Sequence, residues 1–149
     1  MPSASGDAVV AVDAEVARAF VRRLDGWADL LPGYQCHREC SPRVSRWTVR
    51  GDLGMFSRVV EAEVEIVEET PIVRVLVRGI SERFTGEGTF AVAPIESGRA
   101  RLDLALDLRA GGPMAPMIDA LLKTRMPAML QVFASALARR IGQHATAPR

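Results

Sequence analysis

The middle of the chain, from Tyr34 to Arg109, alternates apolar and polar residues at almost every position. In "FSRVVEAEVEIVEE", most even-numbered residues are apolar and three glutamates stand between them. A period of two places successive side chains on opposite faces of a β-strand. Turn-like stretches such as "EETP" and "IESGR" separate these runs, which favours antiparallel neighbours. We therefore predict six strands here, each with one dry face and one charged face.

One strand and three helices are predicted outside this region. "DAVVAVDA" predicts a first strand, and Asp13 then offers an N-cap for a helix in "AEVARAFVRRL". "DGWADLL" predicts a second short helix that is capped at Asp25 and ends before Pro32 and Gly33. From about residue 113 to residue 142, apolar residues recur in steps of three and four, which predicts one long helix.

This order of elements predicts an α+β fold. Seven antiparallel strands form one curved sheet, which wraps around the long C-terminal helix, and two short helices follow the first strand. A single long helix on the dry face of one bent sheet buries the apolar side of both elements. The 149 residues suit one domain.

The composition excludes several classes of protein. The chain is 48% apolar and 25% charged with a net charge of +1, so no strong field attracts nucleic acid. No apolar run approaches the roughly 20 residues that a membrane span requires. The N-terminal sequence lacks the pattern of a signal peptide. We expect a cytoplasmic protein with no nucleic-acid partner and no integral membrane segment.

Two cysteines, Cys36 and Cys40, lie in "YQCHRECSP", which we interpret as a strand. Four residues of strand span about 13 Å, whereas a disulfide requires Cα atoms within about 7 Å. The two thiols are therefore expected to be free and partly buried. His37 would point to the opposite face from both, so the cluster does not suit a metal ion. We expect no metal and no cofactor.

Four stretches, "LPGY", "SRWTVRGDLG", "FTGEGTF" and "GGPMAPMIDALLK", resemble the helix-grip proteins of the START and polyketide cyclase (SRPBCC) superfamily. Within it, the chain is most similar to the G-subunit family of aerobic carbon monoxide dehydrogenase, over about residues 7–141. The resemblance implies a single START-like domain with a cavity between sheet and helix. It also implies an apolar ligand and, as a partner, a molybdenum hydroxylase complex.

The methionines of the long helix are candidate walls of that cavity, because a flexible and polarisable side chain adapts to irregular contents. A methionine stripe at helical spacing is, however, more often plain core. Inward-facing aromatic residues and two interior charges complete the set. The residues expected to bind ligand are Tyr34, Trp47, Arg58, Glu82, Phe84, Phe90, Met114, Met117, Leu121, Met126 and Met129.

Arg58 breaks the apolar pattern of its strand, because alternation places it on the dry face. An unpaired charge there is costly. Three interpretations are open. Arg58 lies at the rim of the sheet with its head in water, or it pairs with an interior carboxylate such as Glu82, or it anchors the polar head group of a ligand.

Two functions from different classes fit the sequence. An enzyme of the cyclase or hydratase type needs a positioned acid or base, and neither His37 nor His144 belongs to a recognisable catalytic set. We assign no catalytic residue. The sequence favours a non-enzymatic carrier of a lipid-, quinone- or polyketide-like molecule, accessory to a carbon monoxide dehydrogenase-like molybdenum hydroxylase. A cyclase or hydratase acting in the same cavity is the alternative.

Overall fold

The computed structural model describes residues 2–52 and 57–146. Its strands are β1 (Ser3–Val10), β2 (Tyr34–Ser41), β3 (Val44–Asp52), β4 (Ser57–Glu68), β5 (Val73–Gly79), β6 (Phe84–Glu96) and β7 (Arg99–Ala110). The helices are α1 (Ala14–Val21), α2 (Leu24–Trp27), the 3-10 helix η1 (Ala28–Leu30) and α3 (Ala115–Thr146).

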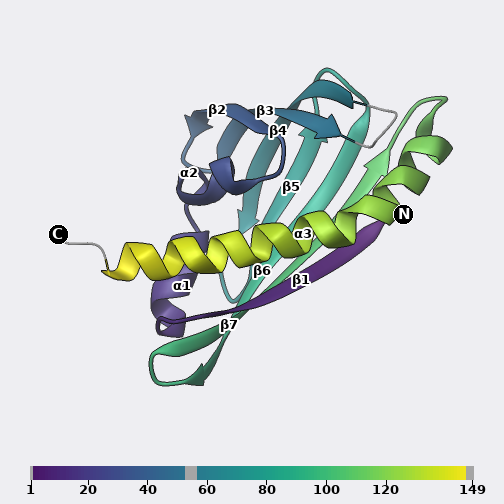
Figure 1. The fold of residues 1–149 in the computed structure, drawn as a ribbon. Coiled ribbons are helices and arrows are strands. Elements are labelled where there is room, and N and C mark those ends of the chain that lie inside the picture. The colour runs from purple at the N-terminus through teal and green to yellow at the C-terminus, as the bar shows by residue number, and fades with distance from the viewer. Residues whose placement is uncertain (1, 53–56, 147–149) are drawn as a thin grey trace.

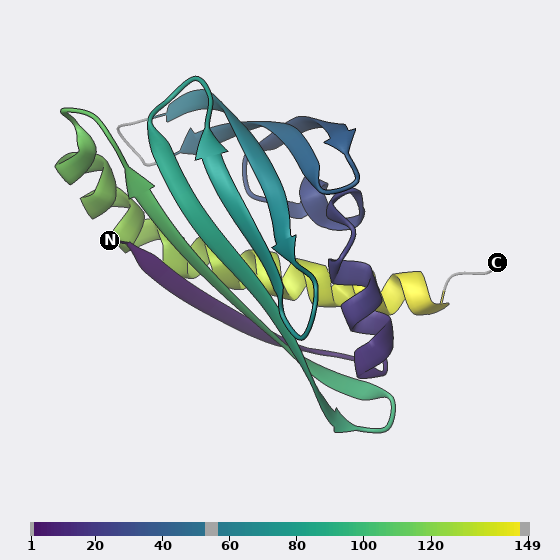
Figure 2. The same ribbon diagram turned by 180° about the vertical axis from the view of Figure 1, so that it is seen from behind.

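All seven strands belong to one antiparallel sheet, in the order β1-β7-β6-β5-β4-β3-β2. The sheet curves, and α3 lies across its concave face (Figure 1). Seen from behind, the outer face of the sheet carries no helix of the described part of the chain (Figure 2). The predicted α+β fold is thereby confirmed.

The first residues of β1, α2 and α3 differ from those predicted, because the period of apolar and polar residues does not mark where a strand or helix begins. β1 begins at Ser3 because its polar first residues pair with β7 through the backbone, starting from Ser3 opposite Asp107. α2 begins at Leu24, with Arg23 as its N-cap, so Asp25 lies in the first turn instead of capping it. α3 begins only at residue 115, because Gly112, with a φ of 86°, turns the chain before the helix.

The strand faces agree with the predicted alternation. Along β4, the inward residues Ala62, Val64 and Ile66 are 2–5% exposed. The glutamates between them lie on the other face, where Glu63, for example, pairs with Arg78 of β5. The apolar side of β4 therefore meets the core, and ion pairs cross the outer face of the sheet.

An aromatic cluster fills the interior at one end of the sheet. The ring of Trp27 lies 4.7 Å from that of Phe90, 5.6 Å from that of Trp47 and 5.9 Å from that of Phe133. The indole Nε1 of Trp27 donates to the Val21 carbonyl at 3.0 Å. These contacts join α2, β3, β6 and α3, so this end of the interior is solid core.

The helix α3 is buried along only part of its length. From residue 126 onward it buries one face, made of Met126, Leu130, Phe133, Ala134, Leu137, Ala138 and Ile141. Residues 115–125 are all exposed or half-buried. The buried part sits directly on β1, where a Cβ at Gly6 would lie 3.0 Å from the Leu130 carbonyl. Gln131 adds two hydrogen bonds to the backbone of Asp7. The N-terminal turns of α3 are thus free to bound a pocket.

The two cysteines are free, but the prediction that they are partly buried is wrong, since both are exposed. Cys36 pairs with Thr48 of β3 and shares its face, which is opposite to that of the buried Trp47, so the thiol lies on the outer face of the sheet. Across residues 2–52 and 57–146, no group of three or more potential ligand side chains could hold a metal ion. Within the same ranges, no helix is long and apolar enough to cross a membrane.

Candidate ligand pocket

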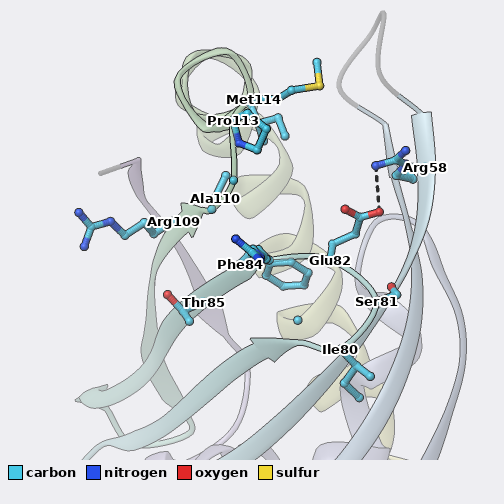
Figure 3. Close-up of a pocket in the computed structure, with 15 residues that line it drawn as sticks. Arg58, Ile80, Ser81, Glu82, Phe84, Thr85, Arg109, Ala110, Pro113 and Met114 are labelled. Carbon is cyan, nitrogen blue, oxygen red and sulfur yellow. Dashed lines mark hydrogen bonds and ion pairs between the residues drawn. The ribbon is translucent and has the colours of Figure 1, made fainter.

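A pocket of about 1000 Å³ opens at the end of the sheet opposite the aromatic cluster. Three segments form it: the turn between β5 and β6, the end of β7 with the loop that follows, and the first turns of α3 (Figure 3). The lining consists of residues 79–85 and 109–114, together with Arg58 and Ile118.

One wall is a tight turn whose shape depends on Gly79. A Cβ at this position would lie 2.1 Å from the Glu82 carbonyl oxygen and 2.7 Å from the Phe84 ring. Only glycine permits the turn and the ring to approach so closely. Two further hydrogen bonds tie the turn to β4, from Ile80 N–H to the Glu61 carbonyl at 2.8 Å and from Glu61 N–H to Ser81 Oγ at 2.9 Å.

The opposite wall is fixed where β7 leads into α3. The N–H of Gly111 donates to the Arg83 carbonyl at 2.7 Å, which extends the pairing of β6 and β7. The N–H of Ala110 donates to the Asp119 carboxylate at 3.1 Å, so α3 is linked back to the strand that precedes it. Both walls are thus held in place by hydrogen bonds from backbone N–H groups, two to carbonyls and two to the side chains of Ser81 and Asp119.

Arg58 and Glu82 face each other at the mouth of the pocket. Arg58 Nη1 donates to Glu82 Oε1 at 2.9 Å, and the side chains are 62% and 37% exposed. Figure 3 shows this ion pair spanning from β4 to the turn between β5 and β6. Alternation placed Arg58 on the correct face, but its strand begins there, so the residue reaches water. Two of the three interpretations of Arg58 are therefore correct at the same time: it lies at the rim of the sheet, and it pairs with Glu82.

Apolar surface is left open inside the pocket. Phe84 and Ile118 are half-buried, whereas Ile80 and Met114 are 41% and 45% exposed. The inward-facing strand residues near the pocket are also less buried than those beside the aromatic cluster. Four of them are only half-buried: Val60, Val77, Leu106 and Leu108. The interior is thus dry beside the aromatic cluster and becomes accessible toward the pocket.

The structure brings together four of the residues predicted to bind ligand: Arg58, Glu82, Phe84 and Met114 line the pocket. Trp47 and Phe90 belong to the aromatic cluster, and Met126 is 2% exposed in the core. Met117 is exposed on α3, and Leu121 and Met129 are half-buried outside the pocket walls. Sequence reasoning missed the turn residues, such as Ile80, because periodicity carries no signal in turns.

Tyr34 lies outside the pocket walls, where its hydroxyl is 2.5 Å from His37 Nδ1. Burial raises the pKa of the Tyr34 hydroxyl above its ordinary value of 10.0, so this group stays protonated at neutral pH. Among the described residues that line the pocket, the only charged side chains are Arg58, Glu82, Arg83 and Arg109, and none is histidine or cysteine. The walls are therefore suited to binding, and Glu82 is the one carboxylate available for acid–base chemistry.

Solved structures with the same fold cover nearly the whole chain. A conserved protein from Geobacillus kaustophilus is 14% identical over 95% of both chains, with a TM-score of 0.78. The Zhui aromatase/cyclase from Streptomyces sp. R1128 is 12% identical over 97% of this chain and 96% of its own, with a TM-score of 0.72. A START superfamily protein from Mycobacterium smegmatis is 21% identical over 95% and 98%, with a TM-score of 0.68.

These identities are low, so the solved structures show a shared fold and carry no function over to this chain. No curated protein sequence is significantly similar to it. The family model described as polyketide cyclase / dehydrase and lipid transport matches residues 1–142, which is nearly the full length. The chain therefore belongs to the polyketide cyclase / dehydrase and lipid transport family.

Proposed function

We propose that the protein binds an apolar small molecule in the pocket at the end of the sheet and acts as a carrier or accessory protein. One observation carries the proposal: apolar side chains of the pocket stay open to solvent while the rest of the interior is packed. A ligand that covered Phe84, Ile118 and Met114 would remove this surface from water, which is favourable. The volume falls in the range of small-molecule sites.

A cyclase or hydratase reaction in the same pocket is the second candidate. It is favoured by the Zhui relative, whose name describes an aromatase/cyclase with this fold. Such a reaction needs a proton acceptor or donor at the substrate, and Glu82 is the candidate group. Glu82 Oε1 accepts a hydrogen bond from Arg58 Nη1 at 2.9 Å, so this carboxylate oxygen is already engaged and is not free to meet a substrate proton. This arrangement favours binding over proton transfer.

The narrower assignment, an accessory protein of a carbon monoxide dehydrogenase-like molybdenum hydroxylase in the cytoplasm, rests on the sequence resemblance to the G-subunit family of that enzyme. The family match supports only the wider family. Copurification with such a hydroxylase from the native host tests this assignment. If the protein is recovered without any component of a hydroxylase, the assignment as its accessory protein is wrong.

The binding proposal is tested with a neutral apolar fluorophore, N-phenyl-1-naphthylamine. Ile118→Asp places a charge on the pocket wall, where bound probe would desolvate it. Burying a side chain of this size is worth about 1.5–3 kcal/mol when complete, so losing contact with the half-buried Ile118 should weaken binding about fivefold or more.

Val132→Asp is the matched control, because Val132 lies on the same helix, is 63% exposed and is absent from the pocket walls. It should leave probe binding unchanged. Native mass spectrometry of protein from its own host would identify a retained molecule. Equal probe affinities of the two variants, or no binding by the wild type, would contradict the proposal.

A further inference from the structure

We propose that the pocket selects ligands whose polar head group is uncharged and offers both a hydrogen-bond donor and an acceptor, such as a hydroxyl or a hydroxyl beside a carbonyl. This inference rests on the proposed function and names the chemical class of its ligand. It follows from the ion pair between Arg58 and Glu82 at the pocket mouth (Figure 3).

The two charges neutralise each other but leave hydrogen-bonding capacity unused. The pair uses Arg58 Nη1 and Glu82 Oε1, at 2.9 Å. A guanidinium carries five N–H donors and an ionised carboxylate has two acceptor oxygens. Within the described part of the chain, no other hydrogen-bond partner of either side chain is seen. A ligand head group that covers these remaining donors and acceptors must itself supply hydrogen-bond partners for them, since leaving them unsatisfied is costly.

A charged head group cannot satisfy these donors and acceptors without a cost in binding free energy. A carboxylate that approached Arg58 would come beside Glu82, and two like charges in one site repel each other. If it displaced Glu82, a carboxylate would be left unpaired beside a desolvating ligand. A cationic head group that approached Glu82 would likewise be repelled by Arg58, or would leave Arg58 unpaired if it displaced it. A hydroxyl, by contrast, accepts from Arg58, donates to Glu82 and leaves the ion pair intact.

The remaining charges near the pocket do not alter this balance at the head group. Arg83 and Arg109 are exposed. Figure 3 shows the Arg109 side chain pointing away from the Arg58–Glu82 pair, on the far side of Phe84. The Arg109 charge, exposed on that far side, acts weakly at the head group because salt screens it. The body of the ligand lies instead against the apolar walls at Phe84 and Ile118.

Three probes of one size and three charges test the inference: 2-naphthalenemethanol, 2-naphthoate and 2-naphthalenemethylammonium, titrated by calorimetry at neutral pH. The wild type should bind the alcohol about fivefold tighter than either ion, which corresponds to about 1 kcal/mol, the upper end of the range for exposed charges. In Glu82→Gln the Arg58 charge is released, so naphthoate should become the tightest ligand. In Arg58→Gln the ammonium probe should become the tightest.

Two further variants serve as controls. Arg109→Gln removes one positive charge from the pocket border and should preserve the wild-type order of the three probes. The exchanged pair, Arg58→Glu with Glu82→Arg, restores neutrality and should restore the preference for the alcohol. Thermal unfolding of each variant establishes that it is folded, which is expected because both positions are substantially exposed.

The outcomes separate this inference from the proposed function. If the wild type binds naphthoate as tightly as the alcohol, or if Glu82→Gln does not favour naphthoate, the head-group inference is overturned and the pocket still binds apolar molecules. If folded wild type binds none of the three probes and no N-phenyl-1-naphthylamine, the proposed function fails, and the inference fails with it.

Discussion

Replacing Gly79 with alanine tests how the pocket wall is built. The added Cβ would lie 2.1 Å from the Glu82 carbonyl oxygen, and separations under 3.0 Å are essentially never seen. The carbonyl must therefore retreat from 2.1 Å to 3.0 Å, a shift of about 0.9 Å. Because this first clash is with backbone in a tight turn, a side-chain rotation cannot relieve it. The Phe84 ring, at 2.7 Å, must move as well.

The expected cost follows from measured effects of overpacking, which are typically about 1–3 kcal/mol. We expect the upper part of that range, about 2–3 kcal/mol, because two separate groups must move. In a domain of this size 1 kcal/mol corresponds to about 2–4 °C in the melting temperature, so Gly79→Ala should melt about 4–12 °C below the wild type. Circular dichroism during heating measures this directly, and urea titration gives the free energy of unfolding.

Gly142→Ala provides the matched control, since a Cβ there meets nothing within 4 Å inside α3. It should stabilise the protein by about 0.5–1 kcal/mol, because alanine loses less backbone entropy in a helix than glycine does. A Gly79→Ala variant that melts within about 1 °C of the wild type would refute the reasoning, because the turn would then yield without cost. The two substitutions must move the melting temperature in opposite directions.

Two other positions test the core and a surface ion pair. Phe133→Ala empties part of the aromatic cluster and should cost about 3–5 kcal/mol in the free energy of unfolding by urea, without abolishing probe binding in the still-folded fraction. Asp29 accepts a hydrogen bond from Arg140, which holds the pKa of its carboxyl below the ordinary value of 3.8. A lowered folded pKa adds stability above the unfolded pKa, and this stability is lost as the pH falls through the folded value. Asp29→Asn should therefore be less stable than the wild type at pH 7. The difference in the free energy of unfolding should be under about 1 kcal/mol, because the Asp29 side chain is half-exposed. This difference should vanish when the pH is lowered well below the ordinary carboxyl pKa of 3.8.

Strand faces could be predicted from the sequence because each inward residue is followed by an outward one, and the sheet preserves that alternation. Ala62, Val64 and Ile66 were assigned to the core on this ground and are buried. The same rule placed Arg58 on the inner face but could not show that its strand begins there. Exposure depends on the distance of a residue from the strand end, and alternation contains no such information.

The pocket itself was less predictable than the fold. Trp47 and Phe90 were expected to bind ligand, yet their rings pack against Trp27 of the short helix α2. Nothing in the period of β3 or β6 indicates that a third aromatic ring fills the space between them. The pocket walls come instead from two turns, which are positioned by long-range backbone hydrogen bonds such as that from Gly111 to Arg83. Local sequence patterns do not encode such contacts.

The division of α3 into a buried part and an uncovered part has a kinetic consequence. Pro127 lies at the boundary, directly after the first buried residue, Met126. Because proline has no N–H, the carbonyl of Lys123 lacks its usual partner, and the helix ladder is weakest there. We expect amide hydrogens of residues 115–125 to exchange with solvent through local opening, whereas those of residues 130–141 exchange only when the whole domain unfolds. The pocket wall formed by the first turns of α3 is therefore expected to move through the fraying of a few helical turns, while the core stays folded.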